Sequence, residues 1–155
     1  MDAVPPERYY FLRIYAIDLD TALHTIKVLR RYKRADVQYA LLRDVAVTYI
    51  RPVSGNNGEH ARDDKLKIGM YVPKPMRKLH DELWRVRREQ FAHSDLRFYR
   101  PKVAKLHGTE KPWFPMSFRG YDYGALLGRL PEIVVLIQAV EGAVQAEIAK
   151  YEAGF

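Results

Sequence analysis

The most restrictive feature of the sequence is the regular spacing of apolar residues between Pro131 and Ala153. Apolar side chains recur there every three or four residues, which is the period of an α-helix that buries one face. These residues are Ile133, Ile137, Val140, Val144, Ile148 and Tyr151. The same period appears in three earlier segments. Most of the chain must therefore fold as helices that bury one face against each other.

The three earlier segments predict three further helices. Two prolines at positions 5 and 6 suit a first helical turn, and the first helix is expected over about residues 7–33. A break at residues 18–20 is an alternative, because aspartate favours caps over helix interiors. A second helix is expected from about Val37 to Arg51, because Pro52 disfavours helical geometry in the residue before it. Pro75 should open a third helix, with an apolar stripe at Met76, Leu79, Leu83 and Val86 and with Phe91 near its end.

The segment from Leu96 to Gly120 has no clean period and contains three prolines and two glycines. We expect an ordered, irregular loop, with a short hairpin around Phe98 and Val103 as an alternative. Its aromatic residues are expected to cover the core rather than to stack on bases. They include Trp113 and Phe114.

These elements combine into one predicted architecture. A short helix near residues 121–129 should precede the last helix, which is expected over about residues 131–153. Residues 1–155 are predicted to form a single all-α domain. It would be an antiparallel bundle of four to five helices, with one irregular crossover loop between the third helix and the C-terminal helices.

Several classes of protein are excluded or disfavoured by composition. The chain contains no cysteine, so disulfide scaffolds, cysteine nucleophiles and thiolate metal sites are excluded. Four of the histidines are scattered without ligand spacing, and we expect no metal site and no cofactor. The first residues lack the basic start and apolar run of a signal peptide. No apolar run is long enough to cross a bilayer. A soluble, cytoplasmic protein without membrane contact is expected.

Positive charge is clustered along the chain. The formal net charge is +7, with five basic residues from Lys27 to Arg34 and seven from Arg85 to Lys105, the latter against two acids. Residues 131–155 hold four glutamates and one lysine. Clustered cations suit a phosphate backbone, so RNA is a candidate partner. A solvated basic face without a ligand explains the same pattern.

Titratable residues crowd together at the end of the third predicted helix. Arg85, Glu89 and His93 are each four residues apart, so they share one face of a helix. Arg88 lies five residues before His93, but its side chain is long enough to reach the same place. The group is completed by Arg87, Ser94 and Asp95. A helix-end histidine stabilised by the macrodipole, beside solvated arginines, is the simpler alternative.

These residue types suit RNA cleavage without a metal. That reaction needs a base for the 2′-hydroxyl proton, a cation for the phosphate and an acid for the leaving oxygen. Histidine titrates near neutral pH and can act as base or acid. Arginine stays charged and grips phosphate oxygens with two hydrogen bonds. One histidine and one arginine per chain are few, and a homodimer would supply two sets.

The pattern resembles the signature of the HEPN superfamily (higher eukaryotes and prokaryotes nucleotide-binding domains). That signature is an arginine, four to six residues and a histidine near the end of a bundle helix. Arg88 gives a gap of four residues to His93, and Arg87 gives a gap of five, so either arginine fits. The strings Ala-His-Ser-Asp at residues 92–95 and Tyr-Ile-Arg-Pro at residues 49–52 are similar to bacterial abortive-infection and uncharacterised branches. The resemblance covers about residues 35–96.

The resemblance implies a helical bundle that dimerises with its motif helices facing each other. Many members are metal-independent RNases that act as toxins or in phage defence and leave 2′,3′-cyclic phosphate ends. An antitoxin or another partner protein is then also implied. Arg88 would bind the scissile phosphate, and His93 would be the general acid or base. Supporting roles would fall to Arg85, Arg87, Glu89, Ser94 and Asp95, and RNA backbone contacts to Arg97, Arg100, Lys102 and Lys105.

Glu89 departs from the family pattern. A polar residue, often asparagine, commonly follows the motif arginine. A carboxylate four residues before His93 would favour protonated imidazole, and it would also repel phosphate. Some members of the superfamily have lost activity. A catalytically inactive module that binds a partner protein or a nucleotide is therefore the alternative function.

Overall fold

The computed structural model describes residues 5–55, 64–91, 99–108, 111–118, 120 and 122–154, and most of these residues are helical. The prediction of a mainly helical chain is confirmed. The α-helices are α1 (Glu7–Leu29), α2 (Ala35–Ser54), α3 (Ile68–Tyr71), α4 (Arg77–Val86), α6 (Tyr123–Leu127) and α7 (Leu130–Glu152). A 3₁₀ turn, η1 (Lys74–Met76), precedes α4, and a π turn, η2 (Arg87–Phe91), follows it.

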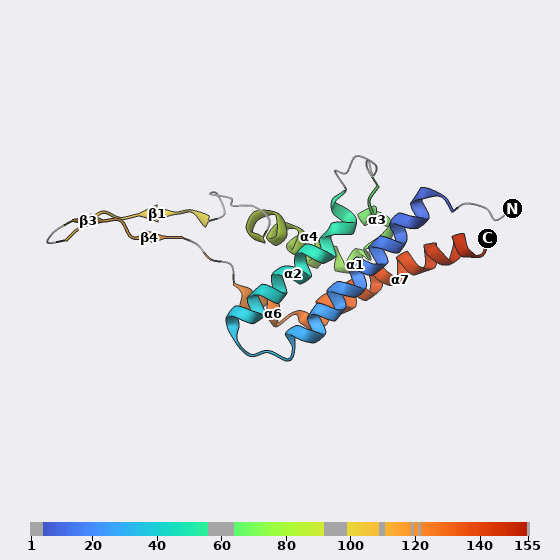
Figure 1. Cartoon of the computed structure of the whole chain (residues 1–155), viewed down its shortest axis with the longest axis horizontal. Coiled ribbons are helices and arrows are strands. Elements are labelled where there is room, and N and C mark those ends of the chain that lie inside the picture. Colours follow the sequence, from blue (N-terminus) through green and yellow to red (C-terminus); the bar gives the residue numbers. More distant parts are fainter. Residues whose placement is uncertain are drawn as a thin grey trace.

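The core lies between the long helices. Figure 1 shows α1, α2 and α7 side by side, and α1 packs against both of the others. Burying a leucine or isoleucine side chain contributes about 1.5–3 kcal/mol relative to leaving it exposed, so these stripes drive folding. The expected apolar stripe of α7 faces the core. Its buried residues include Ile133, Ile137, Val140, Val144 and Ile148.

The bounds of α1 and α2 differ from expectation. α1 is continuous through residues 18–20, where Asp18 is buried and pairs with Arg51 Nη1 at 3.1 Å across the α1–α2 contact. α1 ends at Leu29, its last buried residue, so the basic residues that follow have no apolar face to pack. The expected end of α2 near Arg51 is wrong. The helix runs to Ser54, because buried Pro52 packs in the core and its carbonyl accepts a hydrogen bond from the Leu66 amide at 2.8 Å.

A polar cluster holds the start of α1 against α3 and α7. The Arg8 guanidinium donates to Asp64 Oδ1 at 2.6 Å and to the Tyr71 hydroxyl at 2.8 Å. The Tyr71 hydroxyl donates to Glu147 on α7, and the Tyr15 hydroxyl donates to Asp64. The cluster is partly buried, so these charge-assisted bonds are less screened than surface pairs. It fixes the chain that precedes α3 onto the helical body.

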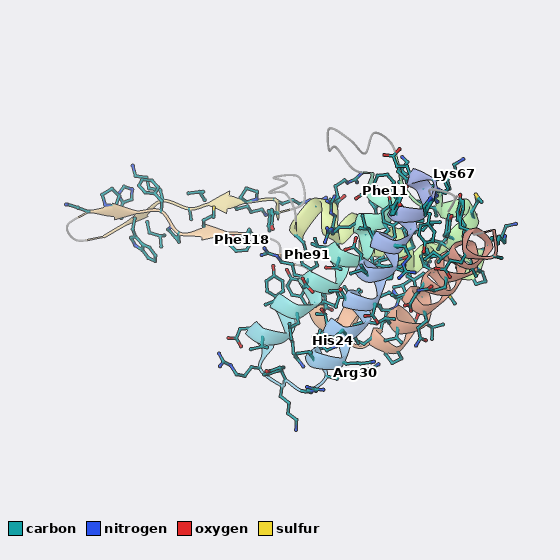
Figure 2. All side chains as sticks on the ribbon, turned by 45° about the vertical axis from the view of Figure 1, so that its right-hand side comes forward. Phe11, His24, Arg30, Lys67, Phe91 and Phe118 are labelled. Atoms are coloured by element: carbon teal, nitrogen blue, oxygen red, sulfur yellow. The ribbon has the colours of Figure 1, made fainter. Side chains whose placement is uncertain are left out.

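The crossover between η2 and α6 contains β structure. Two antiparallel strand pairs form there: β1 (Lys102–Val103) with β4 (Met116–Ser117), and β2 (Leu106–His107) with β3 (Pro112–Trp113). We call the described residues 99–108 and 111–118 the β arm. The arm extends away from the helices in both views (Figures 1 and 2). The prediction of a loop without strands is wrong here, because strands of two residues are too short to give an alternating apolar pattern. The alternative of a short hairpin around Phe98 and Val103 is partly correct: Val103 lies in a strand, but its partner is Met116, and Phe98 lies outside the described residues.

The expectation that the aromatic residues of the crossover cover the core is wrong for Trp113 and Phe114. Trp113 is 55% exposed and Phe114 is 59% exposed. The three long helices and α4 bury their apolar faces against one another, so the core is closed without these rings.

A histidine is fully buried inside the helical body. His80 on α4 is 0% exposed, and its Nδ1 lies 2.7 Å from the Tyr49 hydroxyl on α2. With the ring neutral and its proton on Nε2, the hydroxyl donates to Nδ1. His80 Nε2 has no hydrogen-bond partner within the described residues. Burial lowers the pKa of His80 below its ordinary value of 6.5, and the nearby Asp81 carboxylate acts in the opposite direction.

No helix among the described residues has both the length and the apolar composition needed to cross a membrane.

The buried imidazole predicts a loss of stability in acid. The unfolded chain takes up a proton at this histidine near pH 6.5, whereas the folded chain resists it. The contribution is therefore complete above pH 6.5 and is lost as the pH falls below that value, by at most about 1.4 kcal/mol per pH unit for one proton. Urea unfolding of wild type and His80→Gln should show free energies that converge as the pH falls from about 7.5 to about 5.5. His24→Gln, at an exposed position, should follow wild type, and parallel curves for His80→Gln and wild type would refute the prediction.

Candidate functional site

The residues expected to carry chemistry lie where α4 passes into the π turn η2. The apolar stripe of α4 is buried through Val86, and Arg87–Phe91 then continue with the wider i to i+5 spacing. The wider turn displaces residues 87–91 from α-helical spacing. The expected alignment of residues four apart therefore does not simply extend past Val86. π turns inside helices occur frequently at functional sites.

Arg88 is accessible to solvent and has an acidic neighbour. Its side chain is 61% exposed, and its Nη2 lies 3.4 Å from Oε1 of Glu89, whose side chain is 22% exposed. An ion pair in such a position is worth about 0–1 kcal/mol. Arg88 can therefore exchange this carboxylate for another anion at little cost, and Glu89 is the group that competes with a phosphate.

Arg87 occupies a different environment from Arg88. It is half-buried, and its Nε is buried without a hydrogen-bond partner in the part of the chain that the structure describes. A buried donor without a partner costs free energy, so this position of the Arg87 side chain is maintained by the packing around it and not by a polar contact of Nε. Of the two arginines that fit the spacing, Arg88 is the more exposed to solvent. Arg85 is also exposed, one turn earlier on α4.

The remaining motif residues fall outside the described part. His93, Ser94, Asp95 and Arg97 all lie in the segment 92–98, so their placement relative to Arg88 is not part of the site geometry. The site as described brings together Arg85, Arg87, Arg88 and Glu89. Arg100, Lys102 and Lys105 lie further along the chain, exposed on the β arm.

A groove of about 540 Å³ lies between α2 and the end of η2. Phe91, the last residue of η2, stacks on Tyr123 with ring centres 6.1 Å apart and meets Tyr39 edge-on at 5.9 Å. Figure 2 shows Phe91 on the side of the helical body from which the β arm extends. The groove is lined by Tyr39, Ala40, Arg43, Asp44, Val47 and Phe91. It combines aromatic rings, one exposed arginine (Arg43) and one carboxylate (Asp44). Its lining residue Phe91 lies two residues before His93 in the sequence.

Sequence reasoning did not select the α2 side of this groove. Tyr39, Arg43 and Val47 are four residues apart, so their common face was available from helical spacing. Nothing in the sequence showed that η2 would pack against that face. The contact is tertiary, and it places Phe91 over α2.

Within the described ranges, no group of three or more histidine, aspartate or glutamate side chains is arranged to hold a metal ion.

Comparison of the chain with protein-family models, with curated proteins and with solved structures gave no match. The functional inference therefore rests on the residues of this chain and on their geometry.

The Arg88–Glu89 pair generates a prediction about anion binding. Glu89→Gln removes the acidic neighbour of Arg88, so the variant should elute from immobilised heparin at a higher salt concentration than wild type. The free energy of unfolding should change by less than about 1 kcal/mol, because the Arg88 side of the pair is exposed to solvent.

A charge-matched control separates this effect from net charge. Glu152→Gln makes the same change in charge, but Glu152 pairs with Arg13 near the C-terminus, on the opposite side of the molecule from the β arm (Figure 1). Its shift in elution should be smaller. In an Arg88→Ala background, Glu89→Gln should lose its excess over this control. Equal shifts for both variants would show that Glu89 does not restrain Arg88.

Proposed function

We propose that the chain is a metal-independent endoribonuclease of the HEPN type, which acts on RNA as a homodimer in a toxin or phage-defence role. The observation that carries the proposal is the solvent-exposed Arg88 at the end of the motif helix, followed along the chain by the cationic β arm. In this proposal the helices form an antiparallel bundle of four to five helices, and the motif helices of two copies face each other.

The chemistry assigns one role to each kind of side chain. Arg88 binds the two non-bridging oxygens of the scissile phosphate. The imidazole of one His93 takes the proton of the 2′-hydroxyl, whose oxygen then attacks phosphorus. The bond from phosphorus to the 5′-oxygen breaks, and the protonated His93 of the second copy supplies a proton to that oxygen. The products are a 2′,3′-cyclic phosphate and a 5′-hydroxyl, so atoms and charge balance without a metal.

Neighbouring groups tune these two side chains. Glu89 and Asp95 favour the protonated form of a nearby imidazole, which suits the histidine that acts as acid. Ser94, Arg85 and Arg87 support the site, and the cations Arg97, Arg100, Lys102 and Lys105 hold the flanking RNA backbone. This arrangement uses arginine for charge and histidine for proton transfer, and it needs no cofactor.

A second candidate function has its own supporting observation. Glu89 Oε1 lies 3.4 Å from Arg88 Nη2, so this carboxylate competes with a phosphate for the guanidinium. If that ion pair persists in the presence of RNA, the same face binds a partner protein, such as an antitoxin, or a nucleotide without cleaving it. The chain would then be an inactive HEPN module.

Mutation of the histidine tests the enzymatic proposal. His93→Ala should remain a folded dimer and should lose RNA cleavage by at least about 100-fold, because general acid–base catalysis supplies about that much. The assay is cleavage of mixed RNA in the presence of EDTA, with analysis of the product ends for cyclic phosphate. His24→Ala, a histidine exposed on α1, is the matched control and should cleave like wild type.

Further variants distinguish the arginines and the alternative function. Arg88→Ala should impair cleavage more than Arg87→Ala. A wild-type protein as inactive as His93→Ala, with both proteins folded and dimeric, would refute the enzymatic proposal in favour of the binding module. A monomer by light scattering, under conditions in which cleavage occurs, would refute the proposal that two copies share the chemistry.

A further inference from the structure

The β arm exposes several large apolar side chains to solvent. Two-stranded hairpins are marginal in water by themselves, and exposed apolar patches mark interaction sites. Among the residues that the structure describes, the strands of the arm pair only with each other, in two two-stranded sheets. The exposed apolar residues of the arm are Val103, Leu106, Trp113, Phe114, Met116 and Phe118. The arm therefore has the composition of a binding element.

Charge restricts what the arm binds. Its described residues include no aspartate or glutamate, and the basic residues Arg100, Lys102, Lys105 and Lys111 are all exposed. Residues 131–155, by contrast, hold four glutamates and one lysine. The four cations of the arm favour a partner that carries repeated negative charge. A nucleic acid backbone carries such charge.

The aromatic rings restrict the partner further. Trp113 ends β3 and Phe114 follows it, and successive side chains of an extended chain point to opposite sides. Phe118 follows β4 and meets Tyr99 edge-on, with ring centres 6.1 Å apart. Rings on both sides of a ribbon suit unpaired bases, each of which offers a flat face for stacking. They do not suit an RNA duplex, whose bases are already stacked and whose major groove is too deep and narrow to admit side chains.

We propose that the β arm binds single-stranded RNA, with bases stacked on Trp113, Phe114 and Phe118 and with phosphates held by Lys102, Lys105 and Lys111. This inference rests on the proposed function and names its substrate class. The arm selects an unpaired strand outside the helical body. A strand bound along the arm leads past Phe118 toward the part of the body that carries Phe91 (Figure 2), so that a phosphate further along the strand reaches Arg88. Binding by the arm involves no bond cleavage and can be measured separately from it.

The experiment uses the full-length chain and an RNA that cannot be cut. A 2′-O-methyl oligouridine of about 12 nucleotides lacks the attacking hydroxyl and fits the usual span of such surfaces. The chain has two tryptophans, so Trp84→Phe leaves Trp113 as the only indole. Addition of the oligouridine should quench the fluorescence of Trp113. A duplex of the same length should cause little quenching and should bind more weakly.

Variants of the arm test each part of the surface by fluorescence anisotropy of the labelled oligouridine. Phe114→Ala and Phe118→Ala should each weaken binding about tenfold, since each removes a stacking surface. Ile17→Ala and Val135→Ala, which remove exposed apolar side chains from the helical body, should bind like wild type. Lys102→Gln and Lys105→Gln should each reduce the slope of log affinity against log salt by about 0.7.

Three results would overturn the inference. One is equal affinity for duplex and single strand. Another is that the aromatic variants keep the oligouridine affinity of wild type but shift from dimer to monomer. That result would assign the arm to contact with a second copy of the chain. The third is loss of binding to anionic phosphatidylserine vesicles in those variants without loss of oligouridine binding, which would assign the arm to a lipid surface.

The outcome is separable from that of the proposed function. Oligouridine binding through the arm, in a protein that cleaves no RNA, would retain the arm and reject the nuclease. Cleavage that depends on His93, with no effect of the aromatic variants on affinity for either form of RNA, would retain the nuclease and reject the arm.

Discussion

Burial of α1 between α2 and α7 is the constraint on which the rest of the structure depends. The inner face of α1 carries fully buried leucine and isoleucine at Leu12, Leu19 and Ile26, and it packs against both other long helices. Because this core is closed by three helices, α4 needs only its own short stripe to dock on α2. The buried Tyr49–His80 contact then fixes α4 on α2, and α4 leads directly into η2. The position of Arg88 therefore follows from the packing of residues that do not belong to the candidate site.

The helical part of the fold could be predicted because helical periodicity is local. Each stripe recurs every three or four residues, and the sequence alone places it, as the buried face of α7 illustrates. The ends of helices depend on tertiary contacts and were less predictable. Pro52 should have ended α2, but its burial and the hydrogen bond to its carbonyl hold one more turn in place. Propensity was overridden there by packing.

The candidate site was predictable in its residues and not in its surroundings. The spacing from Arg85 to Glu89 could be read from the sequence, but the π turn that reorients Arg88 could not, because nothing in residues 87–91 requires i to i+5 hydrogen bonds. The groove lined by Tyr39 and Arg43 arises from contact between segments about 50 residues apart in the sequence. A hairpin near Val103 was only an alternative, and the extent and pairing of the β arm could not be predicted, because paired strands of two residues leave no periodic signal.

The exposed rings of the β arm connect the two parts of the molecule. Sequence reasoning assigned Trp113 and Phe114 to the core because large rings are usually buried. The core has no space for these two rings, because the long helices bury their apolar faces against one another. An exposed apolar patch on a cationic ribbon carries an aggregation risk in a free protein. The β arm carries both an exposed apolar patch and basic charge. Both features are explained if the arm binds a polyanion that has flat, apolar faces. The basic charge and the rings, which looked unrelated in the sequence, would then serve to bind the same ligand.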